Sequence, residues 1–240
     1  MDGSRRSHAP PLLTVETLEQ IAAQYATCTR CAELGVPPDP RRDTFFRLAG
    51  DFRPAQVRVL FVAESPPQKN RRGRWSHFYL PEEKPPGEDA STLFWALAEV
   101  LALPESCGMT YSEAFRARTT AKRTLLAEFK DRGLWLVDAA KCAVNGVGEG
   151  EPRKTAVARC AEHWLWRELR VLEPEHVVLV KATVRDLLEP MLTRWGFGPR
   201  LLNERIPHPG SGQRANFRLA MRRLIGRHPV LFGPRGMQAG

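Results

Sequence analysis

The sequence has no long hydrophobic segment. None of its apolar runs approaches the ~18 residues that a membrane-spanning helix needs. Its start, MDGSRRSHAPP, has basic residues but no hydrophobic stretch behind them. We therefore expect a cytoplasmic protein with no membrane partner, and we take a monomer as the working oligomeric state.

Two kinds of catalytic motif are also missing. The sequence has no carboxylate cluster with the spacing of a two-metal site, and no glycine-rich loop of the kind that cradles phosphates. These absences argue against a nuclease or a phosphohydrolase.

The chain is long enough for one domain with a proper core, at 240 residues and 42% hydrophobic content. Residues 1–12 and 233–240 are rich in Gly, Pro and Arg and lack periodic apolar positions. We expect these ends to be disordered tails around a single domain at 13–232.

Positive charge dominates the composition. The formal net charge is +9 and the pI is about 9.7. Clustered Lys and Arg gain free energy by releasing the counterions of a polyanion, so nucleic acid is the first candidate partner. A generally arginine-rich composition with no bound polyanion is the alternative.

Short apolar runs alternate with helical patterns along the chain. VRVLFVAES at 57–65 has the pattern of a buried parallel strand, and similar runs occur at 134–140, 176–182 and around 201–206. Helical patterns lie at 91–103, 120–131, 154–172 and 183–195, and an earlier amphipathic helix has Thr14 as its expected N-cap. The sequence therefore predicts an α/β fold, a three-layer α/β/α arrangement around a short, parallel, four-stranded central sheet.

Polar residues follow three of the expected strands: Glu64 and Ser65, Asp138, and His208 in the loop HPGSG. Ligands of such sheets bind beyond the carboxyl ends of the strands, so these side chains are expected to meet in one crevice. Strand ends are polar in many α/β proteins, which is the structural alternative for each residue alone.

Four of the five cysteines form two pairs. Two residues separate Cys28 from Cys31, seventeen separate Cys142 from Cys160, and Cys107 stands outside both pairs. In a reducing compartment, grouped thiols are typical of metal ligands or catalytic groups. Four thiolates suit zinc or a 4Fe-4S cluster, and spacing alone does not separate the two. Unligated buried cysteines remain the structural alternative.

In order along the chain, CTRC, AESPP, KC with its distant Cys160, and HPGSG resemble the motif series of the uracil-DNA glycosylase superfamily, in particular its iron-sulfur branch known as family 4. The resemblance runs from about residue 15 to residue 225. It implies a DNA repair enzyme of base excision repair, a glycosidase that hydrolyses the N-glycosidic bond of a deaminated or damaged base. It also implies a structural 4Fe-4S cluster held by the four paired cysteines, with zinc as the alternative.

The resemblance assigns roles to the strand-end residues. By analogy His208 donates a hydrogen bond to O2 of the departing base, and Glu64 orients or deprotonates the attacking water. Phe78, in WSHFYL, would stack on the flipped base, with Asp138 and Ser65 as further base contacts; Phe78 as a plain core residue is the alternative.

The same resemblance places a DNA-contacting loop after His208. Gly residues there permit a close approach to the minor groove, and nearby arginines would bind phosphates. A second basic segment, QKNRRGRW at 68–75, suits a phosphate backbone and a stacked base, or is a solvated loop. The expected DNA-binding residues are Arg71, Arg72, Arg74, Gly210, Ser211, Arg214 and Arg218.

Two departures from the family pattern bear on specificity. Asp138 stands where the family has asparagine, and Gly210 stands where it has serine. An amide both accepts from N3–H and donates to O4 of uracil, whereas an ionised carboxylate only accepts. Asp138 is therefore protonated, or nearby Asn145 replaces it, or the substrate is a base with an exocyclic amine or another lesion. A damage-sensing or single-stranded DNA-binding protein without turnover is the competing functional hypothesis.

Overall fold

The computed structural model describes residues 16–67, 77–80, 92–102, 122–147, 150–210 and 212–233. The predicted tail at 1–12, the basic loop at 68–75 with its three arginines, Cys107, Ser211 and all but the first residue of the tail at 233–240 lie outside the described residues. The buried apolar side chains of the described part form one continuous core.

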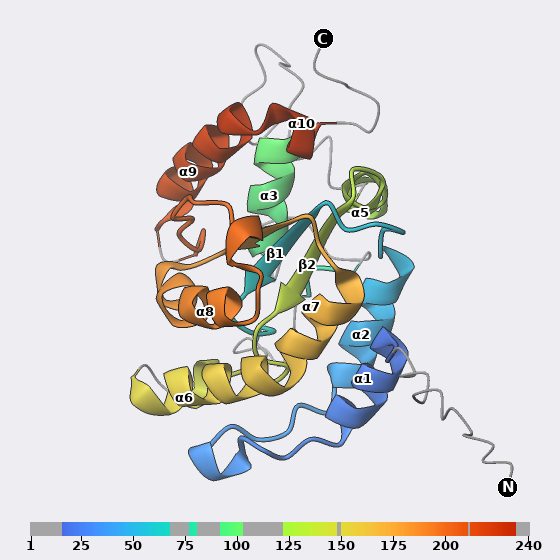
Figure 1. Cartoon of the computed structure of the whole chain (residues 1–240), viewed down its shortest axis with the longest axis vertical. Coiled ribbons are helices and arrows are strands. Elements are labelled where there is room, and N and C mark those ends of the chain that lie inside the picture. Colours follow the sequence, from blue (N-terminus) through green and yellow to red (C-terminus); the bar gives the residue numbers. More distant parts are fainter. Residues whose placement is uncertain are drawn as a thin grey trace, which may run out of the picture.

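The centre of the fold is a parallel sheet of three strands in the order β2-β1-β3 (Figure 1). They are β1 (Val59–Ala63), β2 (Leu134–Asp138) and β3 (His176–Leu179). All five residues of β1 are buried, as expected for the central strand of a sheet covered on both faces. Three of the four predicted strands are thus confirmed.

The fourth predicted strand, around 201–206, does not form a ladder. That segment runs parallel to β3 but touches it only through isolated bridges, at Leu201 and at Ile206. The buried guanidinium of Arg185 accounts for the difference. Its Nη1 donates to the carbonyl oxygens of Leu202, at 3.4 Å, and Glu204, at 3.0 Å. A strand needs those acceptors for its neighbour, so the sheet ends after three regular strands.

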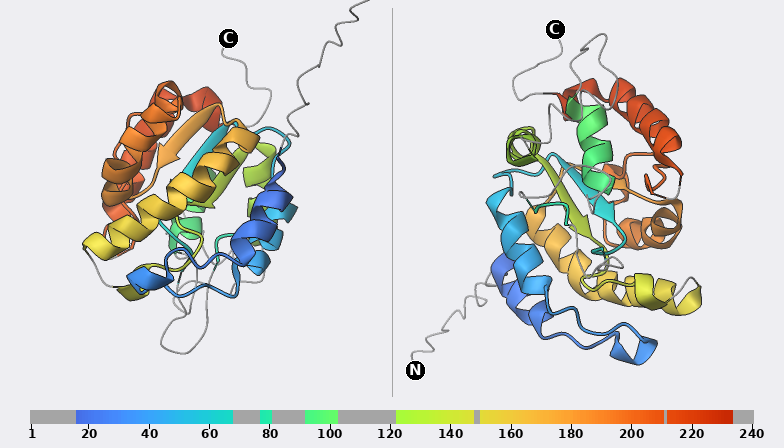
Figure 2. Two further views of the ribbon diagram at one scale, coloured as in Figure 1. Left: turned by 60° about the horizontal axis from the view of Figure 1, so that its bottom comes forward. Right: turned by 180° about the vertical axis from the view of Figure 1, so that it is seen from behind.

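Helices cover both faces of the sheet. Figures 1 and 2 show α7 on one face and α3 on the opposite face, which gives the three-layer arrangement. The α-helices of the described part are α1 (Leu18–Ala26), α2 (Arg42–Asp51), α3 (Thr92–Ala102), α5 (Lys122–Asp131), α6 (Glu151–Cys160), α7 (Trp166–Leu172), α8 (Ala182–Arg194), α9 (Arg214–Arg227) and α10 (Pro229–Phe232). A π-helical turn, Ala161–Leu165, joins α6 to α7.

The first helix begins later than its sequence pattern predicted. Its N-cap is Thr17, whose hydroxyl accepts from the backbone N–H of Gln20 while the Gln20 side chain accepts from the N–H of Thr17. This reciprocal capping box satisfies two backbone donors and fixes the start of the helix. The predicted cap, Thr14, lies outside the described residues.

None of the helices within the described ranges is long and apolar enough to cross a membrane.

Candidate active site and thiol cluster

The sheet brings the polar strand ends together. Ala63 pairs with Asp138 in the parallel register, and the N–H of Ala140 donates to the carbonyl oxygen of Glu64 at 2.9 Å. On the other side of β1, the N–H of Lys181 donates to the carbonyl oxygen of Ile206 at 2.7 Å. The chain segments that carry Glu64, Asp138, Lys181 and the His208 loop therefore leave the sheet at the same edge.

A cavity of about 700 Å³ opens at this edge. That volume is in the range of small-molecule pockets, about 300–1,000 Å³. Each predicted catalytic or base-contacting residue contributes to its wall: Glu64, Ser65, Phe78, Asp138, His208 and the adjacent Gly210. Residues that lie far apart in the sequence thus share one site, as the strand-end argument predicted.

The Glu64 carboxylate is held by two cations that the sequence analysis did not identify. Arg153 of α6 approaches it with its guanidinium fork, Nε at 3.1 Å from Oε1 and Nη2 on Oε2. Lys181 donates from Nζ to Oε2 at 2.8 Å. Arg153 is itself held by the Asn145 Oδ1 at 2.6 Å. Glu64 is therefore an ion-paired carboxylate, only 15% exposed.

Lys181 adopts an unusual backbone conformation to reach this position. Its φ is +87°, in the region that favours glycine, and it forms the N-cap of α8. Non-glycine residues in such regions cost about 1–3 kcal/mol and gather at functional sites. Lys181 is also a polar residue at the end of a predicted strand, so the argument that found Glu64 and Asp138 would have found it too.

His208 lies at the rim of the cavity in a defined tautomer. Its Nδ1 accepts a hydrogen bond from the backbone N–H of Gly210 at 3.1 Å. Desolvation by surrounding protein lowers the pKa of His208, and the nearby ammonium of Lys181 lowers it further. The ring is therefore neutral at pH 7, with its proton on Nε2 as a hydrogen-bond donor.

Gly210 approaches that ring closely. A Cβ at position 210 would lie 3.0 Å from Nδ1 and 3.3 Å from Cε1 of His208, so the imidazole would have to give by a few tenths of an ångström. The residue at position 210 is thus coupled to the placement of His208.

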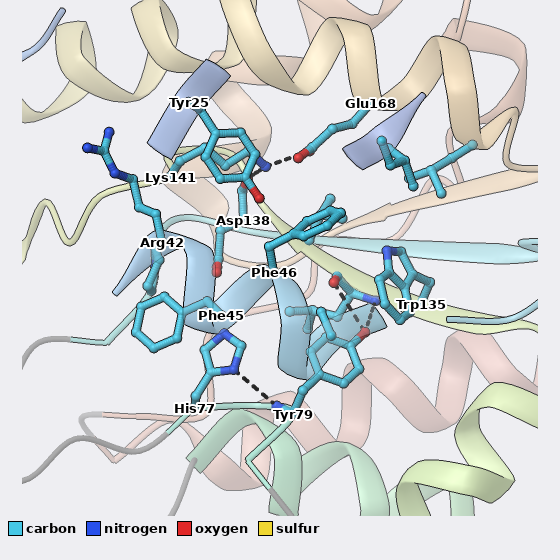
Figure 3. Close-up of a pocket in the computed structure, with 16 residues that line it drawn as sticks. Tyr25, Arg42, Phe45, Phe46, His77, Tyr79, Trp135, Asp138, Lys141 and Glu168 are labelled. Carbon is cyan, nitrogen blue, oxygen red and sulfur yellow. Dashed lines mark hydrogen bonds and ion pairs between the residues drawn. The ribbon is translucent and has the colours of Figure 1, made fainter. Parts of the chain in front are cut away.

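Asp138 lines both the large cavity and a smaller inner pocket of about 70 Å³, which is drawn in Figure 3. Its side chain is half-buried. Desolvation raises the pKa of Asp138 to about 7; the Lys141 ammonium opposes this shift, and the Glu168 and Glu64 carboxylates reinforce it. Asp138 therefore titrates near neutral pH.

The aromatic wall of the cavity is rigid. Phe78 is 5% exposed and packs edge-on against Tyr79 and Phe94. The preceding His77 stacks on Phe45 with ring centroids 4.2 Å apart, and burial lowers its pKa to about 3. His77 lines both the cavity and the inner pocket, a placement that its sequence context did not indicate.

The described arginines that were predicted to contact DNA already have a carboxylate partner. Arg218 Nη1 lies 2.9 Å from Glu99 Oε1, and Arg214 Nη2 lies 3.4 Å from Glu99 Oε2. Both side chains remain more than a third exposed, Arg218 at 39% and Arg214 at 35%. The positive charge of both arginines is therefore partly neutralised by the Glu99 carboxylate of α3.

The four paired cysteines surround one space. Cys28 and Cys31 follow α1, Cys142 follows β2, Cys160 ends α6, and all four line the same small cavity. The buried guanidinium of Arg42 shapes the first pair by donating to the carbonyl oxygens of Cys28, at 2.8 Å, and Ala26, at 2.7 Å.

The donor set fits a thiolate-bound inorganic centre. All four thiols are free. Burial raises the pKa of Cys31 and Cys142, and raises that of Cys160 to about 12. Buried thiols ionise when a metal supplies the compensating charge.

The described residues contain no group of three or more His, Cys, Asp or Glu side chains arranged around a single metal ion. A tetrahedral zinc at about 2.3 Å from each sulfur would need such a group. In a four-iron cluster each sulfur binds a different iron, so the sulfurs stand farther apart.

Comparison of the sequence with protein-family models gives no match, and comparison with curated proteins gives none either. The functional argument rests on the motifs and on the geometry of the site.

Proposed function

We propose that this protein is a DNA glycosylase related to the uracil-DNA glycosylase superfamily, which hydrolyses the N-glycosidic bond of a deaminated or damaged base flipped out of DNA. One observation carries the proposal: Glu64, Asp138 and His208, which were expected from the sequence to share a crevice, line one cavity at the carboxyl ends of the strands. The motif order in the sequence gives the reaction class, and the shared cavity supports it.

His208 has the properties that base departure requires. Cleavage of the glycosidic bond leaves negative charge on the base, and a donor aimed at that charge stabilises the transition state more than the ground state. A neutral imidazole with Nε2–H at the cavity rim supplies such a donor without the cost of a second positive charge.

Glu64 acts in this proposal on the water and on the sugar. Its Oε1 accepts one hydrogen bond, from Arg153 Nε, and keeps a lone pair that can accept from a water. The carboxylate faces the region where the sugar develops positive charge. Because two cations share that carboxylate, we assign it to orienting the water rather than to strong general-base catalysis.

Positive charge at the cavity supports a polyanionic substrate. Arg153 and Lys181 both line it, and two cations share the single Glu64 carboxylate, which leaves a net positive charge for a phosphate. Stacking of a base on an aromatic wall contributes ~1–3 kcal/mol, comparable with the cost of extruding a nucleotide. Phe78 is the aromatic residue that we assign to this contact.

Cys28, Cys31, Cys142 and Cys160 would hold a 4Fe-4S cluster in this proposal. When bound, the cluster would cross-link three segments: the one after α1, the one after β2 and the end of α6. It would take no part in cleaving the glycosidic bond. Binding to the native state adds directly to stability.

A damage-binding protein without turnover is the second candidate. The double ion pair on Glu64 favours it, because a carboxylate held by Arg153 and Lys181 is less able to accept a proton. Base release, rather than binding, separates the two candidates.

The test is release of free base from oligonucleotides that contain uracil, hypoxanthine or xanthine. Wild type is compared with His208→Ala and Glu64→Gln, and with Glu162→Gln as a matched control, since Glu162 forms an exposed ion pair with Arg194. A glycosylase releases at least one base, and the two cavity variants release it more slowly than wild type and the control. Tight binding without release from any substrate would instead favour the damage-binding protein.

A further inference from the structure

We propose that Asp138 reads the base in its neutral form, so that recognition of an edge with a ring N–H beside a carbonyl is lost as the Asp138 carboxyl ionises. This inference rests on the proposed function and names the substrate class and the pH control of the same cavity. Uracil, hypoxanthine and xanthine carry such an edge.

The hydrogen-bonding chemistry requires the proton. A neutral carboxyl presents one acceptor and one O–H donor side by side, which matches N3–H and O4 of uracil. An ionised carboxylate presents acceptors alone and repels O4. Residue 138 can therefore replace the amide of an asparagine only while it is protonated.

No cation of the inner pocket forms an ion pair with the Asp138 carboxyl. Its titratable and charged side chains, from α1, α2, the segment 77–80, the loop after β2, and α7, are Tyr25, Arg42, His77, Tyr79, Lys141 and Glu168. Lys141 Nζ lies 2.5 Å from Glu168 Oε2 and 2.7 Å from the backbone oxygen of Asp138. In Figure 3 the Asp138 carboxyl extends away from that ammonium.

The remaining groups of the inner pocket leave the carboxyl without charge compensation. The Arg42 guanidinium donates to three backbone carbonyl oxygens, of Ala26, Cys28 and Asp39. His77 is neutral, because burial lowers its pKa to about 3. Burial also raises the pKa of Tyr25 and Tyr79, so both phenols stay protonated.

The outer cavity gives the same result. The charged and titratable groups there, from the end of β1, α6, the N-cap of α8 and the loop before α9, are Glu64, Arg153, Lys181 and His208. Both cations are bound to Glu64, and His208 is neutral at pH 7. Within the described part of the chain, no side chain or backbone group donates a hydrogen bond to the Asp138 carboxyl. A buried carboxyl in this setting favours its protonated form.

Asn145 is a poorer candidate for reading the base. It lies exposed at the rim, and its Oδ1 already accepts from Arg153 at 2.6 Å. The half-buried Asp138, which lines both spaces, fits the role better.

The experiment measures single-turnover release of uracil from a single-stranded oligonucleotide at pH 6, 7 and 8, with wild type, Asp138→Asn and Asp186→Asn. Asp186 pairs with Arg205 on the exposed side of α8 and serves as the matched control. With a pKa of about 7, the neutral fraction of Asp138 falls about tenfold from pH 6 to pH 8. The rate of wild type, divided by that of Asp138→Asn at the same pH, should fall about tenfold, and Asp186→Asn should follow wild type.

Taking the ratio at each pH removes the titration of His208 and of the DNA, which both proteins share. A ratio that stays constant from pH 6 to pH 8 would overturn the inference while leaving the glycosylase proposal intact.

A binding measurement keeps the two proposals distinguishable. It uses an oligonucleotide with one non-hydrolysable 2′-fluoro-deoxyuridine and the matching strand without uracil. If no protein releases uracil at any pH, uracil is not a substrate, but the preference for the uracil strand still tests whether neutral Asp138 reads the base. A preference about tenfold stronger at pH 6 than at pH 8 in wild type, and flat in Asp138→Asn, supports neutral Asp138. Equal preference at both pH values in wild type contradicts it.

Discussion

Replacing Asp138 by asparagine should stabilise the protein, and the gain should grow with pH. A carboxyl whose pKa is raised in the folded state binds a proton there that the unfolded chain has already released. Stability is therefore lost as the pH rises from the unfolded pKa toward the folded one. For Asp138 that window extends from about 3.8 to about 7. The isosteric amide does not titrate, so the variant does not lose this stability.

The magnitude follows from the width of the window. One pKa unit corresponds to about 1.4 kcal/mol, so a window of about three units corresponds to about 4 kcal/mol. This is an upper value, because water that enters the two neighbouring spaces screens the charge. Between pH 5 and pH 8.5 the free energy of unfolding of Asp138→Asn, relative to wild type, should increase by about 2–3 kcal/mol.

Denaturant unfolding under anaerobic conditions at pH 5, 6, 7 and 8.5 measures this difference, with Asp186→Asn as the control for an exposed carboxylate. The control should track wild type at every pH. A constant difference between Asp138→Asn and wild type across the range would refute the reasoning, since it would mean that Asp138 is ionised throughout.

Three further perturbations test other parts of the site. Gly210→Ala places a Cβ 3.0 Å from the His208 ring and displaces it by a few tenths of an ångström, so base release should fall severalfold at unchanged melting temperature; an unaffected rate would show that the ring position does not matter. Lys181→Gly and Lys181→Ala both remove the ammonium, but only glycine accepts φ +87° without strain. Lys181→Gly should therefore be more stable than Lys181→Ala by about 1 kcal/mol in denaturant unfolding; equal stability of the two variants would contradict strain at this residue. Anaerobically purified wild type and Cys107→Ser should be brown and carry four irons, whereas Cys160→Ser should lose iron and melt at a lower temperature; colourless wild type with one zinc would refute the cluster.

The three regular strands were predicted from their apolar runs. β1 is apolar and buried throughout, and β2 and β3 are apolar except for their terminal residues Asp138 and His176. The segment at 201–206 has a similar pattern but not the ladder, because a single buried Arg185 takes its carbonyl oxygens. The residue pattern of the segment 201–206 does not reveal this contact, since Arg185 lies outside the segment, on α8.

Helix α2 was not predicted. Its apolar residues Phe45, Phe46, Leu48 and Ala49 have helical spacing, but of its ten residues only Arg42 and Phe45 are buried. An arginine at a buried position also runs against the usual pattern. Its guanidinium is satisfied by carbonyl oxygens of the first cysteine segment, a role visible only in three dimensions.

The candidate site was predictable in its location and less so in its chemistry. The rule that ligands bind beyond parallel strand ends identified Glu64, Asp138 and His208. The partners of Glu64 depended on long-range packing: Arg153 comes from α6, and Lys181 required an unusual backbone angle. The coupling between Gly210 and His208 depends on the space beside the ring, where a Cβ at position 210 would lie 3.0 Å from Nδ1. No residue pattern specifies that distance.

The most direct test of the central claim is the single-turnover rate at which free uracil leaves a uracil-containing oligonucleotide, measured at pH 6 for wild type and His208→Ala. The proposed role of Nε2–H predicts release by wild type and a rate lower by about 10²- to 10³-fold in the variant, as for loss of one donor to a departing oxyanion. Release at the same rate by both proteins would contradict the assignment of the cavity as the catalytic site.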